Sequence, residues 1–303
     1  MSTSAGTAGV IGLGIMGSAI AANLQRAGFR VTGVDVDAKA RDRLRDRLDG
    51  VAGSIAELPG HTHRLISSLP STQALMDVCE ALAGRALACG PGAPRCMLAE
   101  TSTLPIADKQ RARDRLAAAG IGMVDAPLSG TGSQALTRDL AVYASGEPAD
   151  MAELAPVFDG FARARYEVGP FGNGMRMKLV ANLLVAIHNV SSAEALLFAQ
   201  HLGLDPARVV KVVGDGAGAS RMLQVRGPMM AARTWQDATM KVDVWGKDMA
   251  IIGESLAELK LPAPLFAACV PIYQAALAQG HAMHDTAAVY AVLERMAQGT
   301  AGP

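Results

Sequence analysis

The sequence lacks the cysteine patterns of disulfide scaffolds and of zinc sites. None of its four cysteines belongs to a C-x-x-C pair; they are Cys79, Cys89, Cys96 and Cys269. No basic segment precedes the first apolar run, as it would in a secretory signal. We therefore expect reduced thiols in a cytoplasmic protein.

Long uninterrupted apolar runs and a net charge are also missing. The closest candidate for a membrane span, residues 179–193, contains Asn182, His188 and Asn189, so we expect no span. Lysine and arginine together number 28, as do aspartate and glutamate, so the formal net charge is zero. This balance argues against a general surface for nucleic acid or anionic membranes.

Metal-ligand spacing and a hydrolase nucleophile elbow are absent from the sequence as well. The short pairs His61–His63 and His281–His284 have no acidic or cysteine partner at such a spacing, so we expect no metal. The chain contains no G-x-S-x-G, which leaves hydrolase chemistry without support.

The chain does have enough apolar residues for a large core. Its 303 residues are 50% hydrophobic, and this length suggests roughly two domains. In the first half, short apolar runs alternate with helical patterns, which predicts parallel βαβ units and a doubly wound α/β sheet. The expected strands are AGVIG, RVTGVDV, RLISSL, RCMLAE, IGMVDA and LAVYAS.

From Gly172 onward the patterns are almost all helical. Expected helices cover residues 172–201, 205–214, 240–259, 263–280 and 285–297. We therefore predict a Rossmann-type dinucleotide-binding domain over residues 1–170 and an all-helical substrate and oligomerisation domain over 171–303, with a long helix between them. The charged run DAKARDRLRDRLDG predicts a solvated helix face.

A glycine fingerprint, G-L-G-I-M-G, follows the first expected strand and opens a helical pattern. The first glycine permits a tight turn, the second lets the backbone approach a pyrophosphate, and the third allows close packing of helix on strand. The phosphate then rests at the helix N-terminus. We expect this segment to bind a dinucleotide through Gly12, Leu13, Gly14, Ile15, Met16 and Gly17.

Asp35 ends the second expected strand, 18 residues beyond Gly17. A carboxylate there accepts hydrogen bonds from a ribose 2′-hydroxyl and repels a 2′-phosphate, which favours NAD over NADP. Lys39 and Arg41 follow closely and soften this preference, so NADP stays the alternative cofactor.

The stretch GNGMRMKLVAN places Lys178 and Asn182 four residues apart, on one face of a helix. A partly apolar site disfavours the charged form of a lysine, which suits it to act as a general acid/base. Asn182 would then hydrogen-bond the substrate. The plainer alternative is that Lys178 extends into solvent and Asn182 satisfies a backbone group.

Six motifs in order resemble the β-hydroxyacid dehydrogenase family over nearly the whole chain. They are VIGLGIMGSAIAANL, SSLPST at 67–72, ETSTLP at 100–105, DAPLSGTGSQA at 125–135, GNGMRMKLVAN, and KDM at 247–249. The resemblance implies an NAD- or NADP-dependent dehydrogenase that interconverts a small β-hydroxy acid and its semialdehyde or keto acid. It also implies a homodimer or homotetramer formed through the helical domain.

The same resemblance assigns roles to single residues. Lys178 becomes the general acid/base, with Asn182 beside it. The substrate carboxylate is expected at Ser129, Gly130 and Thr131, and further cofactor contacts are expected from Leu69, Pro70, Thr103 and Lys247.

The chain departs from the family pattern at several positions. Thr131 stands where the second glycine of S-G-G is usual, Arg138 and Asp139 occupy a place where glycine is common, and Ala74 replaces a polar residue. These changes leave the identity of the hydroxy acid open. They also leave two alternatives: an imine reductase-like relative, against which Lys178 argues, and a non-catalytic cofactor-binding sensor.

Overall fold

A computed structural model describes residues 6–89 and 94–298 of the chain. The chain forms two compact units, Met1–Lys178 and Leu179–Pro303. The division falls inside helix α7 (Asn173–His201), so one continuous helix belongs to both units. The domain boundary expected at residue 170 stays a prediction.

The first unit is built on a six-stranded sheet whose strand order is β3-β2-β1-β4-β5-β6. Every neighbouring pair in it is parallel. This is the strand order of the Rossmann dinucleotide-binding fold, so the predicted doubly wound sheet is confirmed. The strands are β1 (Thr7–Ile11), β2 (Arg30–Val34), β3 (Gly50–Ala52), β4 (Arg64–Ser67), β5 (Met97–Glu100) and β6 (Gly122–Asp125).

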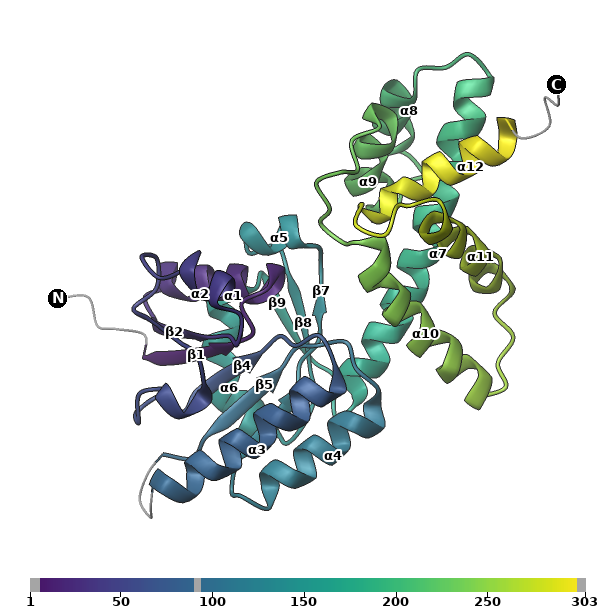
Figure 1. Ribbon diagram of the computed structural model, residues 1–303. Coiled ribbons are helices and arrows are strands. Elements are labelled where there is room, and N and C mark those ends of the chain that lie inside the picture. Colours follow the sequence, from purple (N-terminus) through teal and green to yellow (C-terminus); the bar gives the residue numbers. More distant parts are fainter. Residues whose placement is uncertain (1–5, 90–93, 299–303) are drawn as a thin grey trace. The chain divides into compact units, whose positions relative to one another are not determined.

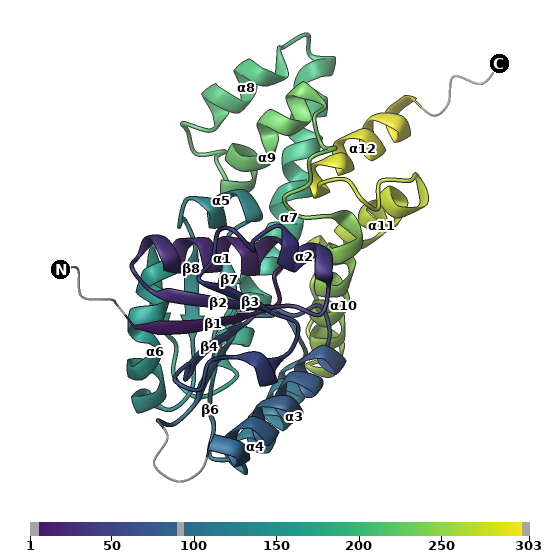
Figure 2. The ribbon, with the colours of Figure 1, turned by 60° about the vertical axis from the view of Figure 1, so that its left-hand side comes forward.

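Helices cover both faces of this sheet (Figures 1 and 2). On one face lie α1 (Ile15–Arg26) and α6 (Pro148–Phe161), and on the other lie α3 (Thr72–Cys89) and α4 (Ile106–Ala117). Successive strand residues point to opposite faces, so Val10 packs into the first core and Ile11 into the second. This alternation explains why the strands read as continuous apolar runs.

A second, three-stranded sheet has the order β7-β8-β9. Its strands are β7 (Leu128–Ser129), β8 (Ala141–Ala144) and β9 (Ala164–Glu167). The LAVYAS strand, expected in the doubly wound sheet, is β8, and its predicted place was wrong. β8 runs antiparallel to β7 because the short connection through α5 (Gly132–Leu136) returns the chain beside β7.

The charged run after β2 is helical only in its first part. Helix α2 (Ala38–Asp42) is followed by turns, so the predicted helix face was too long. Leu44 and Leu48 are buried in the first core and hold these turns against the sheet. A short 3-10 helix, η1 (Ile55–Glu57), then leads toward β4.

The second unit is helical, as expected, and no strand occurs between residues 179 and 298. Besides the end of α7 it holds α8 (Pro206–Val213), α9 (Arg221–Ala232), α10 (Val242–Glu258), α11 (Pro264–Ala278), η2 (Thr286–Ala288) and α12 (Val289–Gln298). Helix α9 was not predicted, because Gly227 and Pro228 interrupt its pattern.

Helix α7 is long and apolar enough, by length and composition alone, to cross a membrane. The central helix of a packed domain meets the same criterion. Ala186, Ala193 and Leu196 of this helix are fully buried in the core of the second unit. We therefore interpret α7 as a core helix.

Candidate active site

The glycine fingerprint forms the turn between β1 and α1. Gly12 has φ +91°, and a Cβ there would lie 2.2 Å from the Ser68 carbonyl oxygen. A Cβ on Gly17 would lie 1.8 Å from the Gly12 carbonyl oxygen, whereas one on Gly14 would meet nothing within 4 Å. Packing therefore requires the first and third glycines, and the second borders open space at the N-terminus of α1, which fits a pyrophosphate.

Asp35 lies directly after β2, beside this turn. Its Oδ2 accepts the Leu13 N–H at 2.6 Å and its Oδ1 accepts the Asp37 N–H at 2.8 Å. The Arg41 guanidinium donates to the carbonyl oxygens of Asp35 and Val36 at 2.7 and 3.0 Å. The carboxylate is thus fixed next to the glycine turn, where a ribose 2′-hydroxyl is expected.

The loops after β4 and β5 reach the same edge of the sheet. The Leu69 N–H donates to Ser102 Oγ at 2.7 Å, which joins the segment that holds Leu69 and Pro70 to the segment that holds Thr103. In open α/β sheets, ligands bind outside the carboxyl ends of the strands. The structure therefore brings together the cofactor residues predicted in the first unit.

The segment predicted to bind the substrate carboxylate ends β7. Gly130 has φ +134°, in the left-handed region that favours glycine. Thr131 is buried and precedes α5; its N–H donates to Gln134 Oε1 at 3.0 Å, and its Oγ1 lies 2.9 Å from Ser133 Oγ. The threonine in place of the usual glycine therefore serves as the N-cap of α5.

The structure also explains a second departure from the family pattern, Arg138 at a place where glycine is common. Its φ is +61°, a conformation that glycine adopts without steric cost. Its guanidinium donates to the Asp159 carbonyl oxygen at 2.6 Å, a contact that holds the arginine in this conformation. The backbone shape that a glycine would give is thus kept by a different residue.

Lys178 lies beside the substrate segment within the first unit. Its Nζ donates to the Leu128 carbonyl oxygen at 2.6 Å, and Leu128 directly precedes Ser129. The side chain is half-buried, so it does not simply extend into solvent as the plainer alternative supposed.

Asn182 and Lys247 belong to the second unit. Asn182 is buried, and its amide donates to Asp248 Oδ2 at 2.8 Å. Lys247 Nζ lies 3.9 Å from Asp248 Oδ1. From the sequence, Asp248 or Glu254 was the alternative partner of Lys247, but the contact between Asp248 and Asn182 was not predicted. Asn182 follows Lys178 by four residues on the continuous helix α7, as predicted.

Sequence reasoning also missed a buried ion triad at the carboxyl edge of the sheet. Lys109 Nζ lies 2.7 Å from Glu100 Oε2 and 2.7 Å from Asp125 Oδ1, and the three side chains are 0% exposed. The contact with Asp125 is a hydrogen bond as well as an ion pair. The sequence did carry a signal for this triad, because Glu100 and Asp125 each follow an apolar run and end a strand.

The expected localisation depended on reduced thiols. Cys79, Cys96 and Cys269 form no disulfide, and the side chain of Cys89 lies outside the described residues. Burial, followed by the charges of Glu100 and Glu80, raises the pKa of Cys79 to about 12. This thiol is therefore protonated and unreactive at neutral pH.

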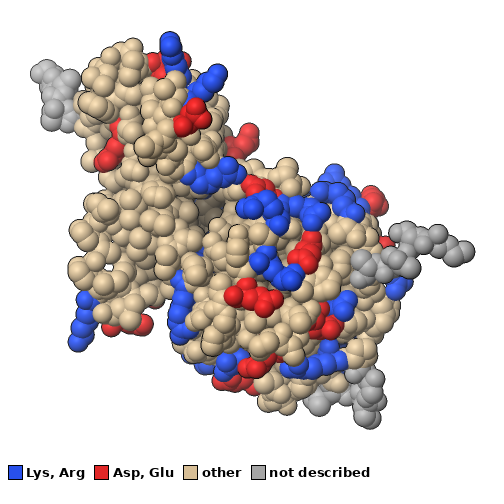
Figure 3. Space-filling view, turned by 180° about the vertical axis from the view of Figure 1, so that it is seen from behind, with Lys and Arg blue, Asp and Glu red and all other residues tan. Residues whose placement is uncertain are grey.

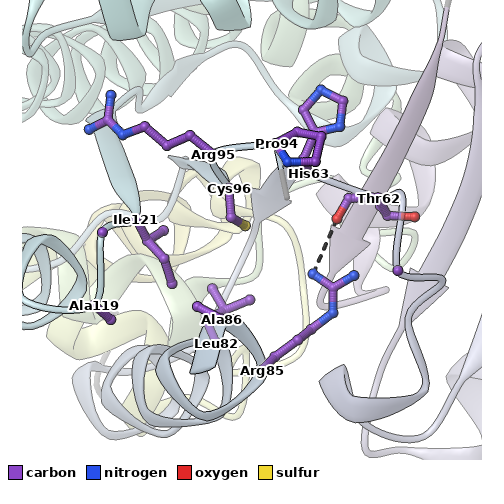
Figure 4. A pocket seen from close by; sticks show the side chains of 12 residues that line it. Thr62, His63, Leu82, Arg85, Ala86, Pro94, Arg95, Cys96, Ala119 and Ile121 are labelled. Carbon is purple, nitrogen blue, oxygen red and sulfur yellow. Dashed lines mark hydrogen bonds between the residues drawn. The ribbon is translucent and has the colours of Figure 1, made fainter. Parts of the chain in front are cut away.

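A small pocket lies at the opposite edge of the sheet, before β4, β5 and β6 (Figure 4). Its volume is about 150 Å³, and its lining includes His63, Arg85, Arg95 and Cys96. Arg85 donates to the Thr62 carbonyl oxygen at 3.2 Å. Since the cofactor residues lie at the carboxyl edge, this pocket is not part of the candidate site.

Charges of both signs are mixed on the surface of the first unit seen in Figure 3. The visible face shows no large area of one sign, which agrees with the zero net charge. Among the residues that the structure describes, no group of three metal-ligating side chains occurs.

Two family models match consecutive parts of the chain. The NAD-binding domain of 6-phosphogluconate dehydrogenase matches residues 7–169. The model described as NAD-binding of NADP-dependent 3-hydroxyisobutyrate dehydrogenase matches residues 172–293.

Individual relatives extend over nearly the whole chain. L-threonate dehydrogenase of Cupriavidus necator is 31% identical over 283 residues, 93% of this chain and 94% of that protein. The 2-hydroxy-3-oxopropionate reductase of Escherichia coli K12 is 30% identical and covers 95% and 97%. The crystal structure of 3-hydroxyisobutyrate dehydrogenase from Salmonella typhimurium has a TM-score of 0.83 at 28% identity, covering 94% and 99%. The chain therefore belongs to the β-hydroxyacid dehydrogenase family and is an NAD(P)-dependent oxidoreductase.

Proposed function

We propose that the protein interconverts a small β-hydroxy acid and its semialdehyde or keto acid, with Lys178 as the general acid/base. The observation that carries this proposal is the position of the Lys178 amine, 2.6 Å from the carbonyl of the residue before Ser129. The amine and the expected carboxylate site thus lie side by side in the unit that holds the glycine turn.

Bound nicotinamide supplies the hydride acceptor for oxidation and the hydride donor for reduction. As the carbinol carbon loses hydride, Lys178 Nζ takes the proton of the substrate hydroxyl, and in reduction it returns a proton to the carbonyl oxygen. The Leu128 carbonyl accepts one N–H of the amine and so fixes its direction. In its charged form the amine also stabilises negative charge that develops on the substrate oxygen.

The substrate carboxylate is assigned to residues 129–131. The left-handed backbone at Gly130 and the helix cap at Thr131 hold this segment in one conformation. Because the Thr131 hydroxyl already contacts Ser133, we assign it a role in shaping the segment, and the carboxylate contacts fall to Ser129 and the adjacent backbone.

We propose NAD as the preferred cofactor and NADP as the alternative. Asp35 is fixed by two backbone N–H groups, so its carboxylate cannot swing away to admit a 2′-phosphate without losing both bonds. Arg41 is bound to two carbonyl oxygens and would have to leave them to bind such a phosphate.

The experiment that tests the function is a turnover assay with a panel of hydroxy acids under both cofactors. The names of the relatives make L-threonate and 2-hydroxy-3-oxopropionate the first compounds to test. Formation or loss of reduced nicotinamide separates an enzyme from a cofactor-binding sensor. Including cyclic imines tests the imine reductase alternative, and turnover of an imine without turnover of any hydroxy acid would contradict our proposal.

We further propose that the protein acts in the cytoplasm as a homodimer or homotetramer joined through its helical unit. Phe198, Leu202 and Val212 of that unit are 66%, 60% and 64% exposed, and apolar surface of this kind is typical of interfaces. A monodisperse monomer in light scattering would contradict the assembly.

A further inference from the structure

We propose that Lys109 is a positioning residue of this enzyme. Its buried ion pairs with Glu100 and Asp125 fix the first turn of α7, and hence the Lys178 amine, relative to the loop that carries Thr103. This inference rests on the function proposed above for Lys178.

The two carboxylates meet because of the sheet register. Glu100 and Asp125 are the last residues of β5 and β6 and are direct partners across these parallel strands. Side chains in matching register point to the same face of a sheet, so two negative groups face one another. Lys109, from α4, lies 2.7 Å from each of them. Without its ammonium group, two buried like charges would remain uncompensated.

The ammonium group stays charged despite its burial. Burial lowers the pKa of Lys109, but the carboxylates of Asp125 and Glu100 raise it by more, so the pKa lies above its usual value. The Met175 N–H, in the first turn of α7, donates to the Asp125 carboxyl group, and the partial positive charge at this helix N-terminus adds to that of the ammonium group.

Asp125 connects the triad to the start of α7. Its Oδ2 accepts the Met175 N–H at 2.8 Å and the Ser145 hydroxyl at 3.1 Å, and Ser145 Oγ accepts the Gly174 N–H at 2.9 Å. A Cβ on Gly174 would lie 2.3 Å from a carbonyl oxygen of β8, so the helix start is pressed against the strands. Lys178 follows Met175 by three residues, about one helical turn. A shift of the helix start therefore moves the amine.

Glu100 connects the triad to the cofactor loops. Its Oε1 accepts the Ser102 N–H at 2.9 Å, and Ser102 Oγ accepts the Leu69 N–H at 2.7 Å. Lys109 thus joins the loops after β4 and β5 to the helix that carries Lys178. The glycine turn and Asp35 belong to β1 and β2, which are separated from β5 by β4. Loss of the triad should therefore spare affinity for the adenosine half of the cofactor.

The test compares Lys109→Met with Arg115→Met. Lys109→Met removes two buried ion pairs of α4, whereas Arg115→Met removes one ion pair of the same helix, with Glu80 on the surface at 2.6 Å. In Lys109→Met we expect kcat to fall about 10- to 100-fold, because a shift of about 1 Å at a reacting group has an effect of this size. Affinity for the adenosine half of the cofactor should be unchanged. Amide exchange should quicken in residues 172–180 but not in residues 192–201, at the far end of α7. Arg115→Met should change none of these quantities.

A second pair of variants keeps the test open if Lys109→Met does not fold. Asp125→Asn keeps an oxygen that accepts the Met175 N–H, whereas Asp125→Ala removes it. Among folded proteins with cofactor affinity intact, Asp125→Asn should retain more turnover and slower exchange in residues 172–180 than Asp125→Ala.

Three results would overturn the proposal: wild-type kcat and exchange in folded Lys109→Met, equal behaviour of the two Asp125 variants, or faster exchange spread evenly over the whole first unit. The exchange measurement needs no substrate. If wild-type protein turns over no hydroxy acid, the proposed function fails, while exchange still decides whether the triad fixes α7.

Discussion

Replacing Lys178 by methionine removes the amine and keeps most of the length of the side chain. The Lys178 amine donates a hydrogen bond to the Leu128 carbonyl oxygen, and the residue lies on α7, an element separate from the glycine turn and Asp35. The variant should therefore fold and bind cofactor normally. General acid/base groups contribute about 10²- to 10⁴-fold to rates, so we expect kcat to fall within that range.

The assay for Lys178→Met follows reduced nicotinamide with the best substrate of the panel, and cofactor affinity is measured separately by fluorescence titration. Arg176→Met is the matched control. Arg176 lies on the same helix, is exposed, and hydrogen-bonds the Asn173 side chain at 2.9 Å, so its loss should leave turnover unchanged. Near-normal kcat in Lys178→Met would refute the assignment of the proton to this amine. A loss of cofactor binding equal to the loss of kcat would refute the argument that the two sites are separate.

Three further predictions concern the cofactor and the stability of the fold. Asp35→Ala should lower the affinity for NAD about 10-fold or more, since hydrogen bonds to charged groups contribute about 1.5–3 kcal/mol. It should also reduce the preference for NAD over NADP. An unchanged ratio of the dissociation constants for NAD and NADP would contradict this prediction. Gly14→Ala should fold normally but bind the cofactor weakly. Gly17→Ala should lower the melting temperature of the protein, because its Cβ would lie 1.8 Å from a carbonyl oxygen. If the two variants had equal melting temperatures, the turn would be able to relax around the added methyl group. Burial and the neighbouring His284 lower the pKa of His281, so the His281 imidazole binds a proton more tightly in the unfolded chain than in the folded protein. The stability of the fold should therefore decrease as the pH drops below about 6.5. In thermal unfolding measured against pH, His281→Gln should make this decrease smaller.

Local pattern was enough to predict most of the helices and the glycine turn. Apolar period and turn residues are properties of neighbouring residues, so G-L-G-I-M-G between a strand and a helix could be recognised from the sequence. The same holds for the spacing of Lys178 and Asn182, since four residues define a helix face without any tertiary contact. Helix α9 shows the limit of this reasoning, because Pro228 is tolerated inside a packed helix but argues against one in isolation.

Only the tertiary structure decided which distant segments meet. The sequence predicted a strand at LAVYAS, but not that the return of the chain through α5 would place it in a separate sheet beside β7. Nothing in the local pattern marks Lys109 as buried, since its position between Glu100 and Asp125 depends on the register of β5 with β6. Periodicity describes what one segment prefers by itself, whereas the pairing of charges and strands depends on contacts between segments far apart along the chain.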